Sequence, residues 1–393
     1  MKYEIDISEH PLASKFPRST IRPTVLDCQG LQLITRREGG PTKLEDYLYS
    51  NDGQLSLHIV SFNDATLVTL TWPHTLFDAM GRRALFDAWI SVLNGRESEV
   101  KPLHGFNSNP LESVGSKITE PHALENRQMK GFVFFIFALR FVFELFWHSK
   151  EEVRVVCLPA AHINSMKSTA LSELATYSSD PDSKPFLSDG DVISAWWTRL
   201  ACSMVPRNSK RSITIMNVFG MRGALEKDLL PANKAYIGNA THSVHAFVPA
   251  NVLFSRPISY TASLIRRSIV EQGTRPQIEA LAAMARQSYI DAKRPPIFGD
   301  GTTKLIAFSN WTKARFFELD FSVAVVKEGY PLEKRKHGLG KPRYLHAHAY
   351  TNNLPVRNAF QISGKDAEGN YWFSGKMRTE TWREIEEGFK TEY

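Results

Sequence analysis

The chain has 393 residues, of which 42% are hydrophobic and 11% aromatic, a composition that excludes a disordered protein and predicts a globular one. A chain of this length is longer than a typical domain with a single hydrophobic core, so we expect two lobes. The formal net charge of +7 gives a weak attraction for anions, with nucleic acid and a polyphosphorylated cofactor such as coenzyme A as the two candidates.

Cysteine usage and the start of the chain indicate a compartment. Cys28, Cys157 and Cys202 lie too far apart in the sequence for a disulfide framework or a metal-ligand cluster. The first residues, MKYEIDISEHPLASKF, contain no apolar run of the kind that a signal peptide needs. We therefore expect a reducing, cytoplasmic location.

The first predicted elements are a hairpin and a helix. Residues 1–53 contain many proline, glycine and polar residues and predict an irregular segment. Two β-branched, apolar runs follow at 55–62 and 66–72, and the short polar stretch between them predicts a hairpin. Apolar residues then recur at helical spacing from Leu76 until an Asn-Gly pair ends the pattern.

The most apolar run in the chain is GFVFFIFALRFVFELFW (131–147), which predicts a helix. It is shorter than the roughly 20 residues that a membrane span needs. It also contains Arg140 and Glu144, which can pair one helical turn apart. A buried or surface-docking helix fits these features better, and weak contact with a membrane stays open as the alternative.

The second half alternates strands and helices. A strand at 151–160 precedes a polar stretch, 168–187, that we expect to cross between the lobes. The S-x-x-D pattern at Ser188 then predicts a helix that starts with a capping box. Further strands are expected at 211–220, 243–250, 304–311, 314–321, 343–351, 358–366 and 371–378, and further helices at 260–272, 276–293 and 379–390. This mixture predicts an α/β fold with an N-terminal lobe at 1–167 and a C-terminal lobe at 188–393.

The stretch WPHTLFDAMG (72–81) carries the first candidate for chemistry. His74 stands between the end of the hairpin and the start of the helix, and a neutral imidazole can accept a proton from a hydroxyl or an amine. Pro73 restricts the backbone before it, and Asp78 falls in the first helical turn, where the helix dipole favours a negative charge. Taken alone, the pattern is more typical of a packed histidine and a helix-start acid than of a catalytic site.

Five stretches in order change this interpretation. They are WPHTLFDAMG (72–81), SDGDVISAWWTR (188–199), NVFGMRG (217–223), YIGNA (236–240) and SNWTKARFFELDFS (309–322). Together they resemble motifs of the BAHD acyltransferases, in their fungal, trichothecene-acetyltransferase-like branch. The resemblance implies two chloramphenicol-acetyltransferase-like α/β lobes with a channel between them, and residues near 309–325 that reach back to the first lobe. It also implies a monomer that uses acyl-CoA as a co-substrate, acts on a small secondary metabolite and holds no permanent cofactor or metal.

The resemblance also assigns roles to individual residues. His74 matches the general base, which deprotonates the acceptor's hydroxyl or amine for direct attack on the thioester, without a covalent acyl-enzyme. Asp78 matches a structural aspartate that pairs with Arg222. Asp320 matches the aspartate of the family's DFGWG motif, also structural. This sequence reads DFSVA there, so Ser322 and Val323 replace the glycine and the tryptophan that is implicated in stabilising the oxyanion.

Two groups of residues are candidates for contact with coenzyme A. Ser188 opens a predicted helix, and helix N-termini favour anions. Lys334 and Arg335 belong to a basic loop, 327–343, for which a merely solvated loop is the simpler interpretation. His346 and His348 alternate on a predicted strand, where packing is a better explanation than metal binding because no third ligand is indicated.

Alternatives to an active enzyme stay open. The altered DFSVA motif, and a segment before His74 that is shorter than is usual in the family, favour a non-catalytic relative that binds coenzyme A or a metabolite. The short segment also leads us to expect a first lobe without its first strands. A carrier-protein-dependent condensation domain fits less well because Pro73 stands where those domains have a second histidine. A DNA-binding regulator fits least, since no helix-turn-helix with basic recognition residues is evident.

Overall fold

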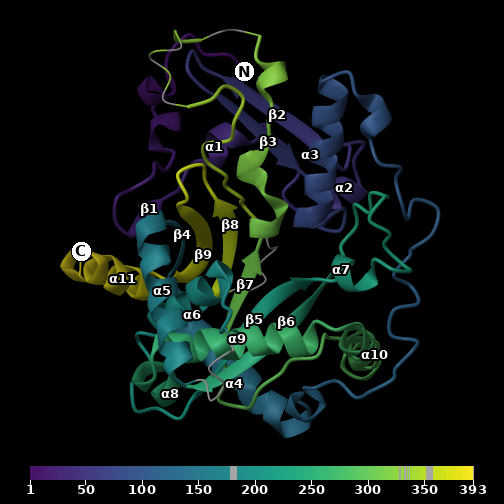
Figure 1. Cartoon of the computed structure of the whole chain (residues 1–393), viewed down its shortest axis with the longest axis vertical. Helices are drawn as coiled ribbons and strands as arrows, with labels where there is room; N and C mark the ends of the chain where they lie inside the picture. Colours follow the sequence, from purple (N-terminus) through teal and green to yellow (C-terminus); the bar gives the residue numbers. More distant parts are fainter. Residues whose placement is uncertain are drawn as a thin grey trace.

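The computed structural model describes residues 1–177, 184–326, 329–331, 333, 335, 337–350 and 357–392. Its centre is a seven-stranded sheet in the order β1-β4-β9-β8-β7-β5-β6, and β2 and β3 form a separate hairpin (Figure 1). The strands are β1 (Thr24–Asp27), β2 (Ser56–Ser61), β3 (Thr66–Thr71), β4 (Glu151–Leu158), β5 (Ser212–Gly220), β6 (Thr241–Pro249), β7 (Lys304–Asn310), β8 (Ala359–Lys365) and β9 (Tyr371–Arg378). The helices are α1 (Gln32–Thr35), α2 (Leu44–Leu48), α3 (Ala79–Leu93), α4 (Gly131–Trp147), α5 (Ala160–Tyr177), α6 (Asp189–Ala201), α7 (Arg222–Leu225), α8 (Ala250–Ser255), α9 (Ile258–Gln272), α10 (Arg275–Ala292) and α11 (Thr379–Glu392).

The large sheet is mixed. β7 runs parallel to β5 and to β8, and the other neighbouring strands are antiparallel. Alternate residues of these strands, such as Ile213 and Ile215 of β5, are fully buried in the main core beneath helices α5, α6 and α9. Trp197 of α6 lies at the centre of this core, with its ring 4.7 Å from that of Phe373. Burial of such aromatic side chains supplies the largest apolar contribution to stability.

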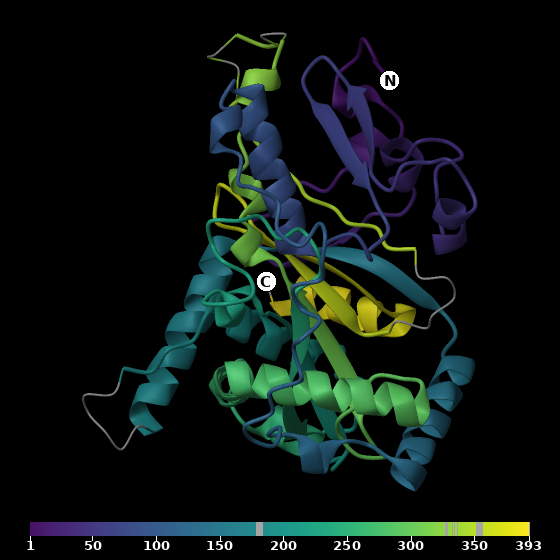
Figure 2. The same cartoon turned by 90° about the vertical axis from the view of Figure 1, so that its right-hand side faces the viewer.

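The two halves of the chain share the large sheet. β1 and β4 come from the first half, and β4 pairs along its whole length with β9, from Glu151–Arg378 to Leu158–Tyr371. The hairpin of β2 and β3 lies apart from this sheet together with the first residues (Figure 2). The lobe boundaries at 167 and 188 stay a prediction.

Most predicted elements are confirmed. The hairpin, the helix at 131–147 and the strands at 304–310, 359–365 and 371–378 all form where the sequence predicts them. The segment 1–53 is largely irregular, but it also contributes β1, whose residues pair with β4 from Thr24–Cys157 to Asp27–Arg154.

Residues 168–177, the first part of the expected crossover, are the end of helix α5, because Met166, Ala170 and Leu174 pack at helical spacing against the main core. Residues 178–183 lie outside the described residues, and the crossover itself stays a prediction. Two local predictions are wrong. Residues 314–321 form 3-10 turns instead of a strand, since Arg315 adopts a left-handed conformation and breaks the extended run. Residues 343–350 form no strand in the part that the structure describes, and position 351 lies outside it.

Helix α4 lies on the surface, so the buried alternative for 131–147 is also wrong: none of its residues is buried. Glu144 pairs with Arg211 and Arg378, at N–O distances of 2.6 and 2.9 Å, rather than with Arg140. Among the described residues, no helix is both long and apolar enough to cross a bilayer.

Two buried histidines make stability depend on pH. His122 and His245 flank Phe298 at ring-centroid distances of 5.8 and 4.9 Å. Burial lowers the pKa of His122 to about 4 and that of His245 to about 3. In the unfolded chain each imidazole binds a proton near pH 6.5, so between pH 6.5 and 4 the unfolded state binds more protons and the folded state loses stability.

We expect the free energy of unfolding to fall by about 2–3 kcal/mol per histidine between pH 7 and 4.5. Urea titrations at a series of pH values measure this slope. His122→Phe, which removes one ionisable ring, should flatten it. An unchanged slope in that variant would argue that other groups cause the acid sensitivity.

Candidate active site

His74 lies at the tip of a turn between β3 and α3. The N–H of Leu76 donates to the carbonyl of Pro73 at 2.9 Å, and Trp72 stacks on the buried Phe77 with ring centroids 5.1 Å apart. These contacts fix the ends of the turn, while His74 itself is exposed. The sequence WPH therefore produces a rigid backbone from which an accessible imidazole projects.

A segment from the second half of the chain holds this turn. The side-chain amide of Asn239 donates to the carbonyl oxygen of His74 at 2.8 Å. Asn239 belongs to YIGNA (236–240), a stretch that was identified only because it resembles a motif of the family. The bond restrains the backbone of His74 and leaves both ring nitrogens available.

Asp78 is buried directly beneath the turn and caps helix α3. One carboxylate oxygen accepts from the N–H of Gly81 at 2.9 Å, and the other accepts from the N–H of Ala240 at 2.9 Å and from Arg222 at 2.8 Å. Arg222 also donates to the carbonyls of Tyr236 and Gly238, at 3.2 and 2.7 Å. The structure thus brings the predicted Asp78–Arg222 pair together and ties it to the segment that contacts His74.

Gly81 allows this close packing. A Cβ atom there would lie 1.8 Å from the carbonyl oxygen of Ile237. We expect Gly81→Ala to lower the melting temperature by several degrees, because a backbone clash costs about 1–3 kcal/mol or more. Gly388→Ala, at a helical glycine with open space, is the matched control and should leave the melting temperature unchanged or higher. Equal melting temperatures for the two variants would contradict the packing described here.

Arg82 has a role that the sequence did not indicate. It is only 5% exposed, and its guanidinium lies 5.0, 4.2 and 4.4 Å from the ring centroids of Trp72, Trp311 and Phe316. Burial lowers its pKa to about 10. Cation–π contacts of this kind join the histidine turn to residues 311–316, and only the fold places the three rings around one arginine.

Asp320 lies apart from the Asp78 pair. Its carboxylate accepts from the N–H of Ser322 at 3.0 Å and pairs with Lys341 at 2.5 Å. The Lys341 ammonium is the main cause of a lowered pKa of about 2 for Asp320. These bonds fix the DFSVA turn to the loop that contains Lys341, and they commit the Ser322 N–H to Asp320. The neighbouring Phe321 packs against Trp89 of α3, so this segment does reach the helix that follows His74.

Two of the candidates for contact with coenzyme A, Ser188 and Arg335, are described, and each makes a hydrogen bond within the chain. Ser188 forms the predicted capping box with Asp191 at the start of α6, with N–O distances of 3.2 and 2.7 Å. Arg335 donates to the carbonyl of Tyr330, and Lys334 lies outside the described residues.

His346 is paired with the hydroxyl of Tyr344, and burial lowers its pKa to about 4. Within the described ranges, no group of three acidic, histidine or cysteine side chains is placed to hold a metal.

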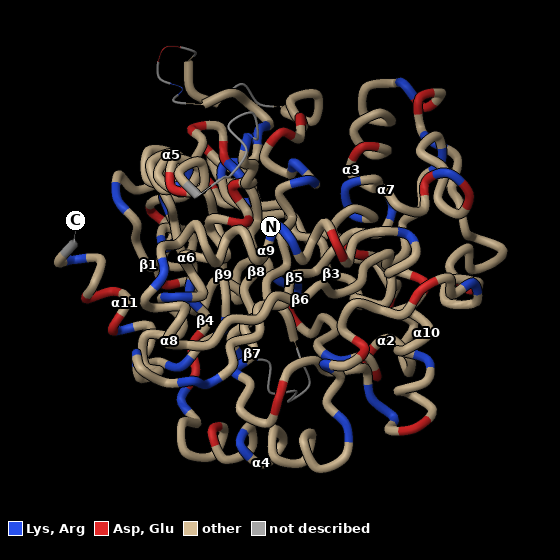
Figure 3. The backbone as a smooth tube through the Cα atoms, turned by 60° about the horizontal axis from the view of Figure 1, so that its bottom comes forward, with Lys and Arg blue, Asp and Glu red and all other residues tan. Residues whose placement is uncertain are grey.

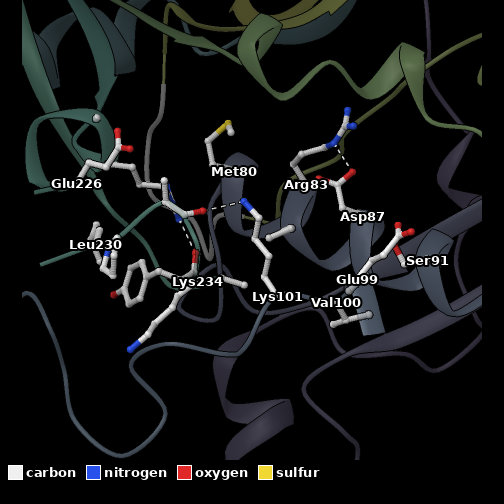
Figure 4. A pocket seen from close by; sticks show the side chains of 18 residues that line it. Met80, Arg83, Asp87, Ser91, Glu99, Val100, Lys101, Glu226, Leu230 and Lys234 are labelled. Carbon is white, nitrogen blue, oxygen red and sulfur yellow. Dashed lines mark hydrogen bonds and ion pairs between the residues drawn. The ribbon is translucent and has the colours of Figure 1, made fainter. Parts of the chain in front are cut away.

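A hollow of about 340 Å³ lies between α3 and residues 222–236 (Figure 4). Its lining includes Arg222 but not His74. The charged residues of the lining are of both signs, and Lys101 already donates to the carbonyl of Ala232 at 2.8 Å. The charged lining residues are Arg83, Lys101, Arg222, Lys234, Asp87, Glu99 and Glu226. This balance does not favour polyphosphate, so we do not assign the hollow to coenzyme A.

The model of a family described as Transferase family matches residues 44–326, which is more than half of the chain. The chain belongs to this family. Its members include the BAHD acyltransferases, and this chain is an acyltransferase of that type.

Several relatives that are similar in sequence come from fungi. A Penicillium decumbens protein named transcriptional regulator calD is 38% identical over 394 residues, covering 100% of this chain and 79% of calD. Acetyltransferase sphE of Aspergillus fumigatus is 35% identical, covering 98% of this chain and 78% of sphE. The F. graminearum TRI101 structure, solved with coenzyme A and T-2 mycotoxin, superposes with a TM-score of 0.62 at 16% identity, covering 85% of this chain and 67% of TRI101. That likeness confirms the predicted α/β fold class.

Proposed function

We propose that this acyltransferase moves an acyl group from acyl-CoA to a hydroxyl, or an amine, of a small secondary metabolite, with His74 as the general base. The observation that carries the proposal is an exposed imidazole on a backbone held by Asn239 and, through Asp78, by Arg222. Relatives named acetyltransferase and O-acyltransferase, and a structural neighbour with coenzyme A and a toxin bound, agree with it. We further propose that the protein acts as a cytoplasmic monomer.

The proposed reaction is a direct transfer. A ring nitrogen of His74 accepts the proton of the acceptor's hydroxyl while the oxygen attacks the thioester carbonyl. The tetrahedral intermediate collapses, the C–S bond breaks, and the CoA thiolate leaves and takes up the proton from the imidazolium. No acyl-enzyme forms, and orientation of the two substrates beside one base supplies much of the acceleration.

The other site residues are supporting parts of the proposal. Asp78 and Arg222 keep the histidine turn in one conformation, and Asp320 fixes the neighbouring DFSVA turn. Ser188, Lys334 and Arg335 are proposed to contact coenzyme A. The Ser322 N–H already donates to Asp320. A different hydrogen-bond donor must therefore stabilise the oxyanion of the tetrahedral intermediate.

A turnover screen tests the function. The purified protein is incubated with several acyl-CoAs and a panel of alcohol-bearing fungal metabolites, and free thiol and acylated product are measured. We expect thiol release that depends on an acceptor and yields an equal amount of ester. Calorimetric binding of acyl-CoA without turnover by any pair would favour the alternative, a non-catalytic relative.

A further inference from the structure

Helix α4 presents a continuous apolar stripe to solvent. Its members recur at spacings of three and four residues and are between 54% and 84% exposed: Phe132, Phe135, Leu139, Val142, Phe143 and Phe146. Trp147 continues the stripe at the C-terminal end, 69% exposed and stacked on Phe143 at 5.6 Å. Large exposed apolar surfaces of this kind mark sites of interaction.

The stripe is exposed because the opposite face of α4 is fixed to the sheet. Glu144 forms ion pairs with Arg211 and Arg378, beside β5 and in β9. Arg357 donates to the carbonyls of Glu144 and His148 at the end of the helix, at 3.0 and 2.6 Å. These bonds set the rotation of α4 about its axis, so the outward direction of the stripe is part of the fold.

The exposed charges of α4 and of the residues that flank it have one sign. Lys130, Arg140 and Lys150 are exposed at its start, middle and end, and the acidic residue of the helix, Glu144, is turned toward the sheet. In Figure 3 the tube of α4 is uncharged along most of its length. An aromatic stripe bordered by Lys and Arg is the pattern of helices that lie in a membrane interface.

We infer that the outer face of α4 docks onto an anionic lipid bilayer, with the helix parallel to the membrane plane. Phenylalanine and leucine side chains enter the acyl boundary, Trp147 lies at the headgroup level, and the three cations contact lipid phosphates. A second copy of the chain is a poorer occupant. Two such helices packed about a twofold axis would place Arg140 near Arg140, and the stripe offers no exposed carboxylate to compensate.

Vesicle co-sedimentation tests this inference. The full chain is mixed with vesicles of phosphatidylcholine alone and of phosphatidylcholine with phosphatidylserine. We expect roughly tenfold stronger partitioning onto the anionic vesicles, since each cation near such a surface contributes several-fold. The double variant Phe135→Glu/Leu139→Glu should lose most of this binding. Leu44→Glu/Leu48→Glu, at exposed leucines of α2 far from α4, is the matched control and should bind like wild type.

Further measurements separate the outcomes. Circular dichroism verifies that the α4 variant is folded, and Lys130→Gln/Arg140→Gln should reduce binding to anionic vesicles only. Light scattering gives the oligomeric state. Vesicle binding by the α4 variant equal to that of wild type would overturn the inference. A wild-type protein that is dimeric and does not bind vesicles, together with a monomeric α4 variant, would also overturn it. Acyl transfer is not used as a readout, so the result stands apart from the proposed function.

Discussion

Replacing His74 with alanine is expected to lower kcat for acyl transfer by about 10²–10⁴-fold, the usual contribution of a positioned general base. Asn239 donates its hydrogen bond to the backbone carbonyl of His74 and not to the imidazole. The alanine variant keeps this bond, so the turn is preserved. We therefore expect an unchanged melting temperature and an unchanged affinity for acyl-CoA. Steady-state kinetics and calorimetry with the same acyl-CoA measure the two effects separately.

Thr75→Ala is the matched control for this loss. Thr75 is exposed in the same turn as His74, and its alanine variant should retain nearly full kcat. A His74→Ala enzyme with more than about a tenth of wild-type kcat would exclude general-base catalysis by this residue.

Replacing Asp78 with alanine is expected to lower the free energy of unfolding by about 3–5 kcal/mol, because it breaks a buried ion pair and removes the cap of α3. The carboxylate is 6% exposed and accepts from Arg222, Gly81 and Ala240. Activity should fall with stability, since the same bonds hold the histidine turn. Urea unfolding followed by circular dichroism measures the change.

Asp87→Ala provides the comparison on the same helix. Asp87 is 55% exposed and pairs with Arg83, so its loss should cost at most about 1 kcal/mol. A double-mutant cycle of Asp78→Ala and Arg222→Ala should give a coupling of about 1–3 kcal/mol. Equal stabilities of the Asp78→Ala and Asp87→Ala proteins would show that the buried pair does not organise this region.

Local patterns in the sequence predicted the elements whose contacts are local. The hairpin of β2 and β3 followed from two β-branched runs, and the bounds of α4 followed from one predominantly apolar run. The capping box at Ser188 followed from the spacing of two residues. In each case neighbouring residues determine the hydrogen bonds, so the pattern and the structure coincide.

Contacts between segments that are far apart in the sequence could not be predicted from local patterns. The pairing of β1 with β4 joins residues more than 100 positions apart, and nothing in TVLD identifies its partner. The site behaves in the same way: Asp78 and Arg222 came from resemblance to a family, whereas Arg82 among three aromatic rings carried no signal. The strand predicted at 314–321 does not form, because the left-handed conformation of Arg315 interrupts the extended run.

The role of His74 is best tested by measuring product formation by wild type and by His74→Ala side by side. Both proteins are given the same acyl-CoA and the acceptor identified in the screen, and free coenzyme A and acylated acceptor are quantified together. We expect equal amounts of both products from wild type, at a rate at least about 100-fold above that of the variant. Equal rates from the two proteins would contradict general-base catalysis by His74.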